Sequence, residues 1–291
     1  MKASGSPSGG VLYLVATPIG NLEDITLRAL RILKEADVIA CEDTRQTQKL
    51  LNHYGVTART ASYHEHNEMT RAAELVVELE EGAKVALVSD AGMPAISDPG
   101  YRLISLAIRH DIPVVPIPGA SAFVAALAAS GLPTDSFRFG GFLPAKRGAR
   151  RSELEQIKDS PRTQIFYEAP HRLQETLADV VEVLGPERQV VIAREVTKLH
   201  EEFLRGHAEE LRKQLEDREI KGEVTLLIRA AEAGAAGPVA VELPQKKSVR
   251  SRVQEVMQEH QLDQKAALKV VAREMGVSKS EAYRELQRSP R

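Results

Sequence analysis

The sequence contains little cysteine and no long apolar run. Its single cysteine, Cys41, excludes a disulfide framework and a cysteine-rich metal site, and it fits a reducing compartment. No apolar run reaches the roughly 18 residues that a membrane-spanning helix needs. Residues 1–10 lack the apolar core of a signal peptide and are expected to form a disordered tail. These absences predict a soluble, cytoplasmic protein.

Strong net charge and classical nucleotide motifs are also lacking. The formal net charge is −2 over 291 residues, so the whole-chain balance does not indicate a nucleic-acid or membrane partner. The loop after the first apolar segment is not G-x-G-x-x-G, and G-x-x-x-x-G-K-[ST] occurs nowhere in the chain. Classical dinucleotide and P-loop nucleotide sites are therefore excluded.

Short apolar segments alternate with helical patterns from Val11 to about Ser130, which is typical of a parallel sheet with helices on its faces. The predicted strands are Val11–Ala16, Val38–Cys41, Thr60–Tyr63, Lys84–Val88 and Pro113–Ile117. The predicted helices are Thr26–Ala36, Thr47–Tyr54, Thr70–Glu81, Tyr101–His110 and Ala120–Ser130.

The pattern changes after the break at 131–134, where predicted strands follow one another with little room for a helix. We therefore expect a mixed sheet in this part of the chain. The predicted strands are Phe137–Phe142, Thr163–Tyr167, Gln189–Arg194, His200–Arg205 and Glu223–Ala230. The predicted helices are Ser152–Lys158, Arg172–Leu184 and Ala208–Glu216.

The last part of the chain has a separate character. Small residues at 231–238 predict a linker, and no strand pattern follows. Ala266–Met275, a glycine-containing turn with Ser278 as N-cap, and Lys279–Leu286 form a helix-turn-helix pattern. From Gln245 onward there are 11 basic and 6 acidic residues, a net charge of +5, while the remainder is acidic. This asymmetry indicates an anionic partner for the tail.

The predicted fold class is α/β, with two tandem α/β domains, a ligand cleft between them and a small helical C-terminal domain. The chain is long enough, at 291 residues with 43% hydrophobic content, for this arrangement. The predicted boundaries are a tail at 1–10, an N-terminal domain at 11–131, a second domain at 132–231, a linker at 232–246 and a basic helix-turn-helix-like domain at 247–291.

The loop after Lys84–Val88 is the first candidate for a site. The continuous apolar strand indicates burial on both faces, and ligands in open α/β sheets bind where such strands end. The loop itself, Ser89–Gly100, contains small residues, two carboxylates, two prolines and two glycines. Small side chains let the backbone approach a ligand, and the carboxylates supply acceptors.

Two further small-residue loops follow predicted strands. Val15–Leu22 could be an ordinary strand-to-helix turn, but its place beside the other loops favours ligand contact. Pro116–Ala122 leads into an alanine-rich helix, whose first backbone N–H groups can bind a carboxylate or hydroxyls. Close packing of helix on sheet is the alternative reason for its small residues, and both can hold together.

Two segments place charged residues after a strand. In Cys41–Arg45, two adjacent acids beside an arginine could orient a substrate, although Asp43 as a helix N-cap is the alternative. In Tyr167–Leu173 a proline ends the strand and begins a helix. An ordinary charged helix start is the alternative to a cleft-facing role for its three candidates, Glu168, His171 and Arg172.

The segment Tyr63–Glu68 is dense in titratable groups. His64 and His66 would project to one side of an extended chain, as metal ligands do, but no third ligand stands at a suitable spacing. A general base or an RNA contact is favoured over a metal site, and a solvated loop is the alternative.

The order of these segments resembles a known family, the ribosomal RNA small-subunit methyltransferase I group, a branch of the tetrapyrrole-methylase-like S-adenosylmethionine enzymes. The similarity covers about Val11–Ala230, and the helical tail resembles the small C-terminal domain of some members. The segments that carry the resemblance are Leu12–Leu22, Cys41–Arg45, Ser89–Gly100, Pro118–Ala122 with Gly131–Pro133, and Tyr167–Leu173.

The resemblance implies transfer of a methyl group from S-adenosylmethionine to the 2′-hydroxyl of a cytidine in the decoding region of 16S rRNA, within the small ribosomal subunit. It also implies a homodimer, no membrane partner, and a cofactor folded in the cleft. Tetrapyrrole relatives have Gly-Gly-Asp-Pro where this chain has Ser-Asp-Ala-Gly, so backbone contacts are expected to carry over better than the aspartate's role. The implied cofactor contacts are Ile19, Ser89, Asp90, Ala91, Gly92, Ile96, Ser121, Ala122 and Glu168.

The implied chemistry needs alignment and a base. A sulfonium methyl is already activated, so the protein mainly aligns the attack and excludes water. The ribose hydroxyl is a poor nucleophile at neutral pH, and a positioned base should help. The candidate bases, among which the sequence does not choose, are Asp43, His66 and Glu168. No metal is expected, and the candidate substrate contacts are Arg45, His171, Arg172, Lys279 and Arg284.

Two other functions remain open from the sequence. A small-molecule methyltransferase of the tetrapyrrole type would share the scaffold but has no need of a basic helical tail. A DNA-binding regulator with an α/β sensor domain would explain the tail, but not the charged motifs that are predicted to face a cleft.

Overall fold

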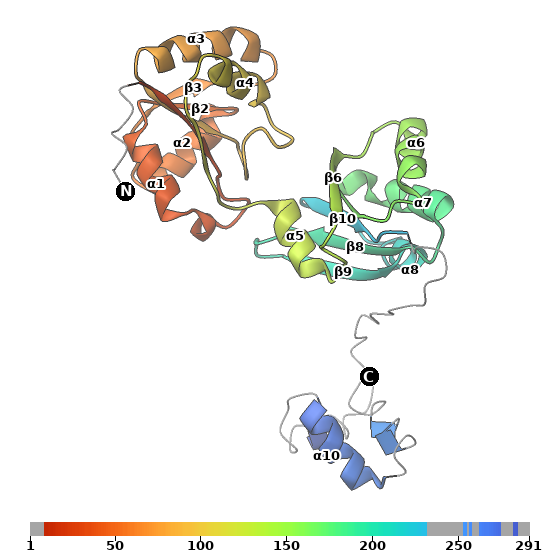
Figure 1. Ribbon diagram of the computed structural model, residues 1–291. Coiled ribbons are helices and arrows are strands. Elements are labelled where there is room, and N and C mark those ends of the chain that lie inside the picture. The colour runs from red at the N-terminus through yellow and green to blue at the C-terminus, as the bar shows by residue number, and fades with distance from the viewer. Residues whose placement is uncertain (1–8, 232–252, 255, 258–261, 275–281, 285–291) are drawn as a thin grey trace. The chain divides into compact units, whose positions relative to one another are not determined.

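A computed structural model describes residues 9–231, 253–254, 256–257, 262–274 and 282–284 (Figure 1). The chain divides into two compact units, Met1–Gly234 and Ala235–Arg291. The first unit holds two five-stranded sheets. Within the described ranges, no helix is both long and apolar enough to cross a membrane.

The first sheet is parallel throughout and has the strand order β3-β2-β4-β1-β5. Each predicted strand of this half ends within one residue of an observed one, so the predicted parallel sheet is confirmed. Successive residues of β4 pack into cores on opposite faces, Val85 and Leu87 on one side and Ala86 and Val88 on the other, as expected of a doubly covered strand. The strands are β1 (Val11–Val15), β2 (Val38–Cys41), β3 (Arg59–Ser62), β4 (Lys84–Val88) and β5 (Val114–Ile117).

Two pairs of helices cover this sheet (Figure 1). α1 (Leu27–Glu35) and α2 (Thr44–His53) contribute to the core on one face, whereas α3 (Glu68–Glu80) and α4 (Tyr101–Arg109) contribute to the core on the other. The short 3-10 helix η1 (Leu22–Asp24) precedes α1. α2 begins at Thr44 rather than at the predicted Thr47, because the Asp43 side chain accepts a hydrogen bond from the Arg45 amide and caps the helix.

The second sheet is mixed, as the sequence predicted, with the order β6-β7-β10-β8-β9. β6 and β7 are parallel, and the remaining pairs are antiparallel. The predicted strand at His200–Arg205 lies two residues later, at β9 (Glu202–His207). The other strands are β6 (Phe137–Phe142), β7 (Thr163–Glu168), β8 (Gln189–Arg194) and β10 (Val224–Ile228).

Helices cover both faces of the second sheet as well. α6 (Arg147–Ile157), α7 (Leu173–Leu184) and α8 (Ala208–Gln214) share a core with one face, and the short η2 (Pro170–Arg172) leads into α7. The other face is covered by α5 (Ala122–Ser130), whose Ala126 and Leu127 belong to a core with strands of this sheet. α5 follows the last strand of the first sheet and packs on the second sheet, so it connects the two halves of the first unit.

α6 begins five residues before the predicted start at Ser152. Its first turns carry arginines rather than the apolar residues that mark a buried helix face. Arg150 is nonetheless fully buried, and its Nε donates to Asp179 Oδ2 on α7 at 2.8 Å. An internal ion pair therefore replaces apolar packing there, and the apolar pattern did not reveal the helix start.

In the second unit the structure describes α10 (Gln264–Glu274). Ala267, Leu268 and Val271 pack against Val253 and Val256 in a small core. Residues 282–284 are helical and fall within the predicted second helix. The remainder of that helix, the predicted cap Ser278 and the predicted linker at 232–246 lie outside the described residues.

Candidate functional site

Loops from both halves of the first unit surround a cavity of about 310 Å³. This volume lies at the lower end of the range for small-molecule sites. The structure brings together seven of the predicted cofactor contacts in its walls: Ile19, Ala91, Gly92, Ile96, Ser121, Ala122 and Glu168. Residues near the ends of β7 and β10 complete the walls, including Tyr167, Val224 and Thr225.

A two-way backbone bridge holds the β4 loop against the loop after β1. The amide of Thr17 donates to the Gly92 carbonyl at 2.9 Å, and the amide of Gly92 donates to the Thr17 carbonyl at 3.1 Å. The Thr17 hydroxyl also donates to the Ser89 carbonyl at 3.0 Å. Gly92 has φ +83°, a conformation that glycine adopts without penalty. The sequence favoured these small-residue loops as ligand walls, and the bridge fixes two of them side by side.

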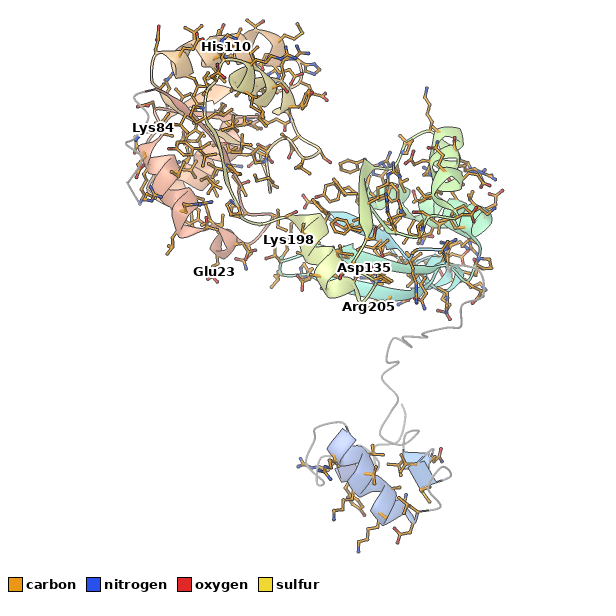
Figure 2. All side chains as sticks on the ribbon, in the orientation of Figure 1. Glu23, Lys84, His110, Asp135, Lys198 and Arg205 are labelled. Carbon is orange, nitrogen blue, oxygen red and sulfur yellow. The ribbon has the colours of Figure 1, made fainter. Side chains whose placement is uncertain are left out.

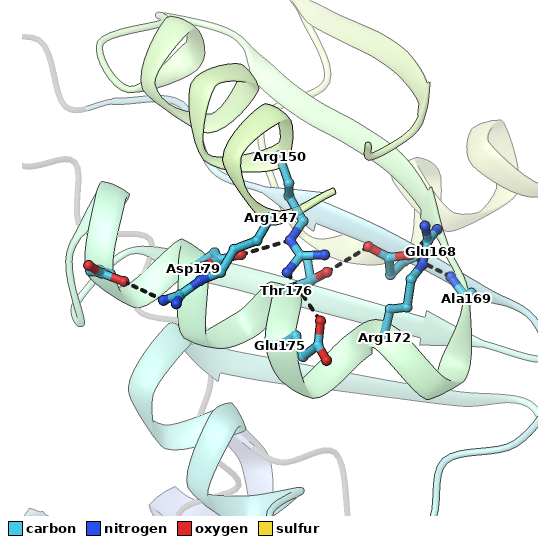
Figure 3. Close-up of polar contacts among 9 residues, drawn as sticks. Arg147, Arg150, Glu168, Ala169, Arg172, Glu175, Thr176 and Asp179 are labelled. Carbon is cyan, nitrogen blue, oxygen red and sulfur yellow. Dashed lines mark hydrogen bonds and ion pairs between the residues drawn. The ribbon is translucent and has the colours of Figure 1, made fainter. Parts of the chain in front are cut away.

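Glu168 closes the cavity from the second sheet, and its carboxylate is fully engaged (Figure 3). Oε1 accepts from the Ala169 amide at 2.7 Å and pairs with Arg172 Nη2 at 2.7 Å, while Oε2 accepts from the Thr176 hydroxyl at 2.6 Å. These contacts lock the turn between β7 and α7. A buried carboxylate that already has three donors suits a structural clamp better than a base, although Glu168 was one of the three candidates. Arg172, a predicted substrate contact, is a partner in the same clamp.

The other two candidate bases lie outside this cavity. Asp43 makes a bidentate pair with the Arg45 guanidinium at 3.1 and 2.8 Å, and these hydrogen bonds lower the pKa of the Asp43 carboxyl to about 2. A carboxylate with so low a pKa is a weak proton acceptor. His66 is exposed after β3, and its ring lies edge-on to that of His64, 5.9 Å between centroids. Neither residue lines either cavity described here.

A second cavity of about 570 Å³ adjoins the first and shares Ile19, Ala91 and Glu223 with it. Two predicted cofactor contacts, Ser89 and Asp90, line this second cavity. Asp90 Oδ1 accepts from the Asp43 amide at 3.2 Å. The adjoining cavities therefore meet at the first residues of the β4 loop.

Two lysines, Lys49 and Lys198, line the second cavity. Lys198 (Figure 2) lies between Glu195 Oε1 at 2.9 Å and Glu223 Oε2 at 3.1 Å. Its side chain fills the space beside Gly20, where an added Cβ would come within 2.3 Å of Lys198 Cγ. The adjacent Thr197 hydroxyl donates to the Asp24 carboxylate of η1. The β8–β9 loop therefore packs against the segment after β1, through Lys198 beside Gly20 and through the Thr197–Asp24 hydrogen bond.

Two of the remaining predicted substrate contacts, Arg45 and His171, line neither cavity. The Arg45 side chain is 87% exposed, and His171 is exposed on η2. Arg284 belongs to the second compact unit, and Lys279 lies outside the described residues. Within the described parts of the chain, no group of three or more His, Cys, Asp and Glu residues is arranged to hold a metal ion.

Sequence reasoning missed several residues in these walls. Asp98 and Tyr167 stand inside segments that were already singled out, but nothing in the sequence marked them above their neighbours. Lys198 comes from the β8–β9 loop, and Glu223 and Thr225 come from the start of β10, all without a recognisable motif. Only the order of the second sheet, which places β10 beside β7, brings Thr225 next to Tyr167.

The fold and the cavity define the class of protein first. Residues 11–212 match the family described as Tetrapyrrole (Corrin/Porphyrin) Methylases. The solved structure of the methyltransferase CobJ is similar, with a TM-score of 0.57 at 20% identity, over 79% of this chain and 98% of that chain. The chain belongs to the tetrapyrrole methylase family and has its fold, as the sequence resemblance implied.

Curated relatives identify the branch. A protein of Halalkalibacterium halodurans named "Ribosomal RNA small subunit methyltransferase I" is 53% identical over 278 residues, covering 94% of this chain and 93% of that protein. A protein of the same name from Micromonospora olivasterospora is 42% identical over 286 residues, covering 98% and 89%. The chain therefore belongs to the ribosomal RNA small subunit methyltransferase I family. It is a methyltransferase, and its cofactor is S-adenosylmethionine.

Proposed function

We propose that this protein methylates the 2′-hydroxyl of a cytidine ribose in the decoding region of 16S rRNA, with the cofactor in the first cavity. The name of its relatives supports an rRNA substrate. The structural observation that carries the proposal is the pair of adjoining cavities. One has small-residue walls suited to a cofactor, and the other carries Lys49, which suits a phosphate-bearing substrate.

The first cavity fits S-adenosylmethionine in its chemistry. Ser121 is the N-cap of α5 but makes no side-chain cap hydrogen bond, so its hydroxyl is available to a carboxylate or to ribose hydroxyls. Ile19, Ile96 and Tyr167 offer apolar and aromatic surface for an adenine ring. When bound, the cofactor supplies an activated methyl group.

The protein's own part in the reaction is alignment and exclusion of water. The bridge between Thr17 and Gly92 fixes the wall that both cavities share, and the Glu168 clamp fixes the opposite wall. Lys49, whose ammonium group contacts the uncharged Gln46 side chain, lines the second cavity and can attract RNA phosphate there. A rigid placement of both reactants accounts for a large part of the rate in such transfers.

An assay with labelled S-adenosylmethionine tests the proposal. The purified protein is offered immature 30S particles, free 16S rRNA and a porphyrin precursor. Label in RNA supports the proposal, whereas label in the porphyrin alone would support the tetrapyrrole-type alternative that the shared fold leaves open. Comparison of particles with free rRNA identifies the form of the substrate.

The basic tail is proposed to capture the substrate rather than to take part in the chemistry. A chain ending at Ala233 loses a segment with 11 basic and 7 acidic residues, a net charge of +4, but keeps both cavities. Cofactor affinity should be unchanged in calorimetry. Affinity for 30S particles should fall about tenfold or more, with a shallower dependence on salt, because fewer counterions are released. Loss of cofactor binding would give the tail a structural role, and unchanged RNA affinity would remove it from recognition.

Methylation should not depend on a bound transition metal. An activated methyl donor needs no Lewis acid, and His64 and His66 form no wall of either cavity. Protein dialysed against a chelator should therefore keep its full methylation rate in a buffer that contains magnesium alone, which the RNA needs to fold. A loss of rate that added zinc restores would contradict this expectation.

The proposed partners follow from the substrate. We propose that the protein acts on 16S rRNA within the small ribosomal subunit, in the cytoplasm where that particle is assembled. The homodimer implied by the resemblance is part of the same proposal. Light scattering behind a size-exclusion column should give twice the 31.9 kDa mass of the chain, and a mass of one chain at micromolar concentration would contradict the dimer.

A further inference from the structure

Asp98 and Ser89 connect the two cavities. Asp98 lines the first cavity, Ser89 lines the second, and Ser89 Oγ lies 2.8 Å from Asp98 Oδ2. The backbone before Asp98 is strained, since Ala95 and Ser97 have φ of +67° and +63°. Such strain persists where the surrounding structure holds a residue in a required position. Asp98 is therefore held at the junction where a cofactor and a substrate would meet.

The hydrogen bonds around Ser89 do not balance if Asp98 is a carboxylate. Ser89 Oγ accepts from the Ala91 amide at 3.1 Å, and it lies 2.9 Å from the Ala91 carbonyl oxygen as well as 2.8 Å from Asp98 Oδ2. One hydroxyl hydrogen cannot serve both oxygens. A proton on Asp98 resolves the conflict, because the Asp98 carboxyl then donates to Ser89 and the Ser89 hydroxyl donates to the Ala91 carbonyl.

In the described parts of the chain, Asp98 and Asp90 are the two acids of the cavity walls that pair with no cation, and of these two Asp98 lines the first cavity. Glu168 pairs with Arg172, Asp43 pairs with Arg45, and Glu223 pairs with Lys198. An arginine or lysine partner keeps a carboxylate ionised and weakly basic. Asp98 is half-buried beside a serine hydroxyl instead, which leaves its protonation open to control by a charged ligand.

We propose, on the basis of the function proposed above, that Asp98 holds a proton before the cofactor binds, releases it when the positively charged sulfonium enters the cavity, and then accepts the proton of the ribose 2′-hydroxyl. In the transfer step the 2′-oxygen forms a bond to the methyl carbon, and the bond from that carbon to sulfur breaks with its electron pair left on sulfur. The 2′-proton passes to an Asp98 oxygen. The positive charge on sulfur, which favoured the Asp98 carboxylate, disappears in the same step. The affinity of Asp98 for a proton therefore rises as the 2′-proton is transferred.

The surroundings of Asp98 favour its protonated form in the protein without cofactor. Burial raises the pKa of the Asp98 carboxyl, the Ser89 hydrogen bond opposes this shift, and the charge of Asp90 adds to it. Glu42 after β2 and Tyr167 of β7 also face it. A cation in the cavity lowers the pKa of such an acid, so protons are released on binding at pH values between the pKa of the free protein and that of the complex.

Calorimetry of cofactor binding tests the proposal through proton release. Binding of S-adenosylmethionine is measured from pH 4.5 to 7.5 in buffers of different ionisation enthalpy, which gives the number of protons released. The wild type should release up to about one proton at the acidic end and none at the alkaline end. Asp98→Asn, which keeps the hydrogen bond to Ser89, should bind without this release. Glu42→Gln, whose carboxyl also has a raised pKa but lines neither cavity, should release as the wild type does.

Neutral S-adenosylhomocysteine provides a measurement on the wild type alone, should the variant fail to fold. It carries the same adenosine and amino-acid groups without the sulfonium charge, and its binding should release distinctly fewer protons. Equal release with both ligands would overturn the proposal, as would unchanged release in Asp98→Asn. Failure of the wild type to bind S-adenosylmethionine at all would instead overturn the proposed cofactor site.

The single-turnover methylation rate gives a second readout. Asp98→Asn should slow transfer by about 10²- to 10⁴-fold, the usual contribution of a positioned base. It should also remove the acidic limb of the pH profile, where protonation of Asp98 in the wild-type complex slows transfer. A variant that keeps the wild-type rate and the acidic limb would contradict a role for Asp98 in accepting the proton.

Discussion

Gly92→Val is expected to lose S-adenosylmethionine binding while the protein stays folded. At φ +83° a β-branched residue costs about 1–3 kcal/mol of backbone strain. An added Cβ would lie 3.4 Å from Ile19 Cγ2 and 3.6 Å from the Ala120 carbonyl oxygen, so the methyl groups beyond it must enter the cavity or push these walls apart. Calorimetry should show a loss of at least about a hundredfold in affinity, with an unchanged circular dichroism spectrum.

A matched control separates strain from obstruction. Gly82 has φ +101°, and an added Cβ there meets nothing within 4 Å. It precedes β4, whereas Gly92 follows that strand. Gly82→Val should therefore lose a similar amount of stability and bind S-adenosylmethionine as the wild type does. Wild-type affinity in Gly92→Val would show that the β4 loop is not a wall of the cofactor site.

Asp179→Ala should lower the free energy of unfolding more than any other substitution considered for this protein. Asp179 is buried, accepts from Arg150 Nε at 2.8 Å, and accepts from Arg147 Nε at 3.0 Å (Figure 3). Without Asp179 the Arg150 guanidinium stays buried, and its remaining ionic contact is with the exposed Glu175 at 3.4 Å. Removal of one partner from a buried ion pair costs about 3–5 kcal/mol, because the other charge is left without compensation.

Urea unfolding measures this loss, and Glu182→Ala is its control. Glu182 pairs with Arg147 and Arg151 in the same cluster, but its side chain is 49% exposed. Exposed ion pairs contribute about 0–1 kcal/mol, so Glu182→Ala should leave the free energy of unfolding nearly unchanged. Equal losses in the two variants would show that the Arg150–Asp179 pair does not anchor α6 to α7.

Most of the fold could be predicted because its signals are local. Each strand of the first sheet is a short apolar segment between helical patterns, and this alternation sufficed to place all five of them. Where polar contacts replace apolar packing, the apolar pattern does not show where a helix begins. The start of α2 depends on the Asp43 cap, and the start of α6 depends on the buried pair of Arg150 with Asp179. The packing of α5 on the second sheet had no local signal, since its sequence is apolar on all sides.

The walls of the candidate site could be predicted from the sequence, but the base could not. Strand-end loops of small residues indicated the walls, and the cavity gathers Ile19, Gly92 and Ser121 from three separate loops. The choice of a base was not predictable, because it depends on partners. Asp43 and Glu168 are each paired with an arginine in the folded chain, whereas Asp98 is paired with Ser89. A sequence shows which acids are present but not which of them folding leaves without a cation.

Methylation of a ribose hydroxyl in 16S rRNA is tested by the position of the methyl group that the protein adds. RNA from small subunits treated with the protein and S-adenosylmethionine is digested to nucleosides and analysed by mass spectrometry. We expect one additional 2′-O-methylcytidine per 16S rRNA, located in the decoding region by fragment analysis and resistant to alkaline cleavage at that position. A methyl group on a base, on another nucleotide or on no RNA at all would contradict it.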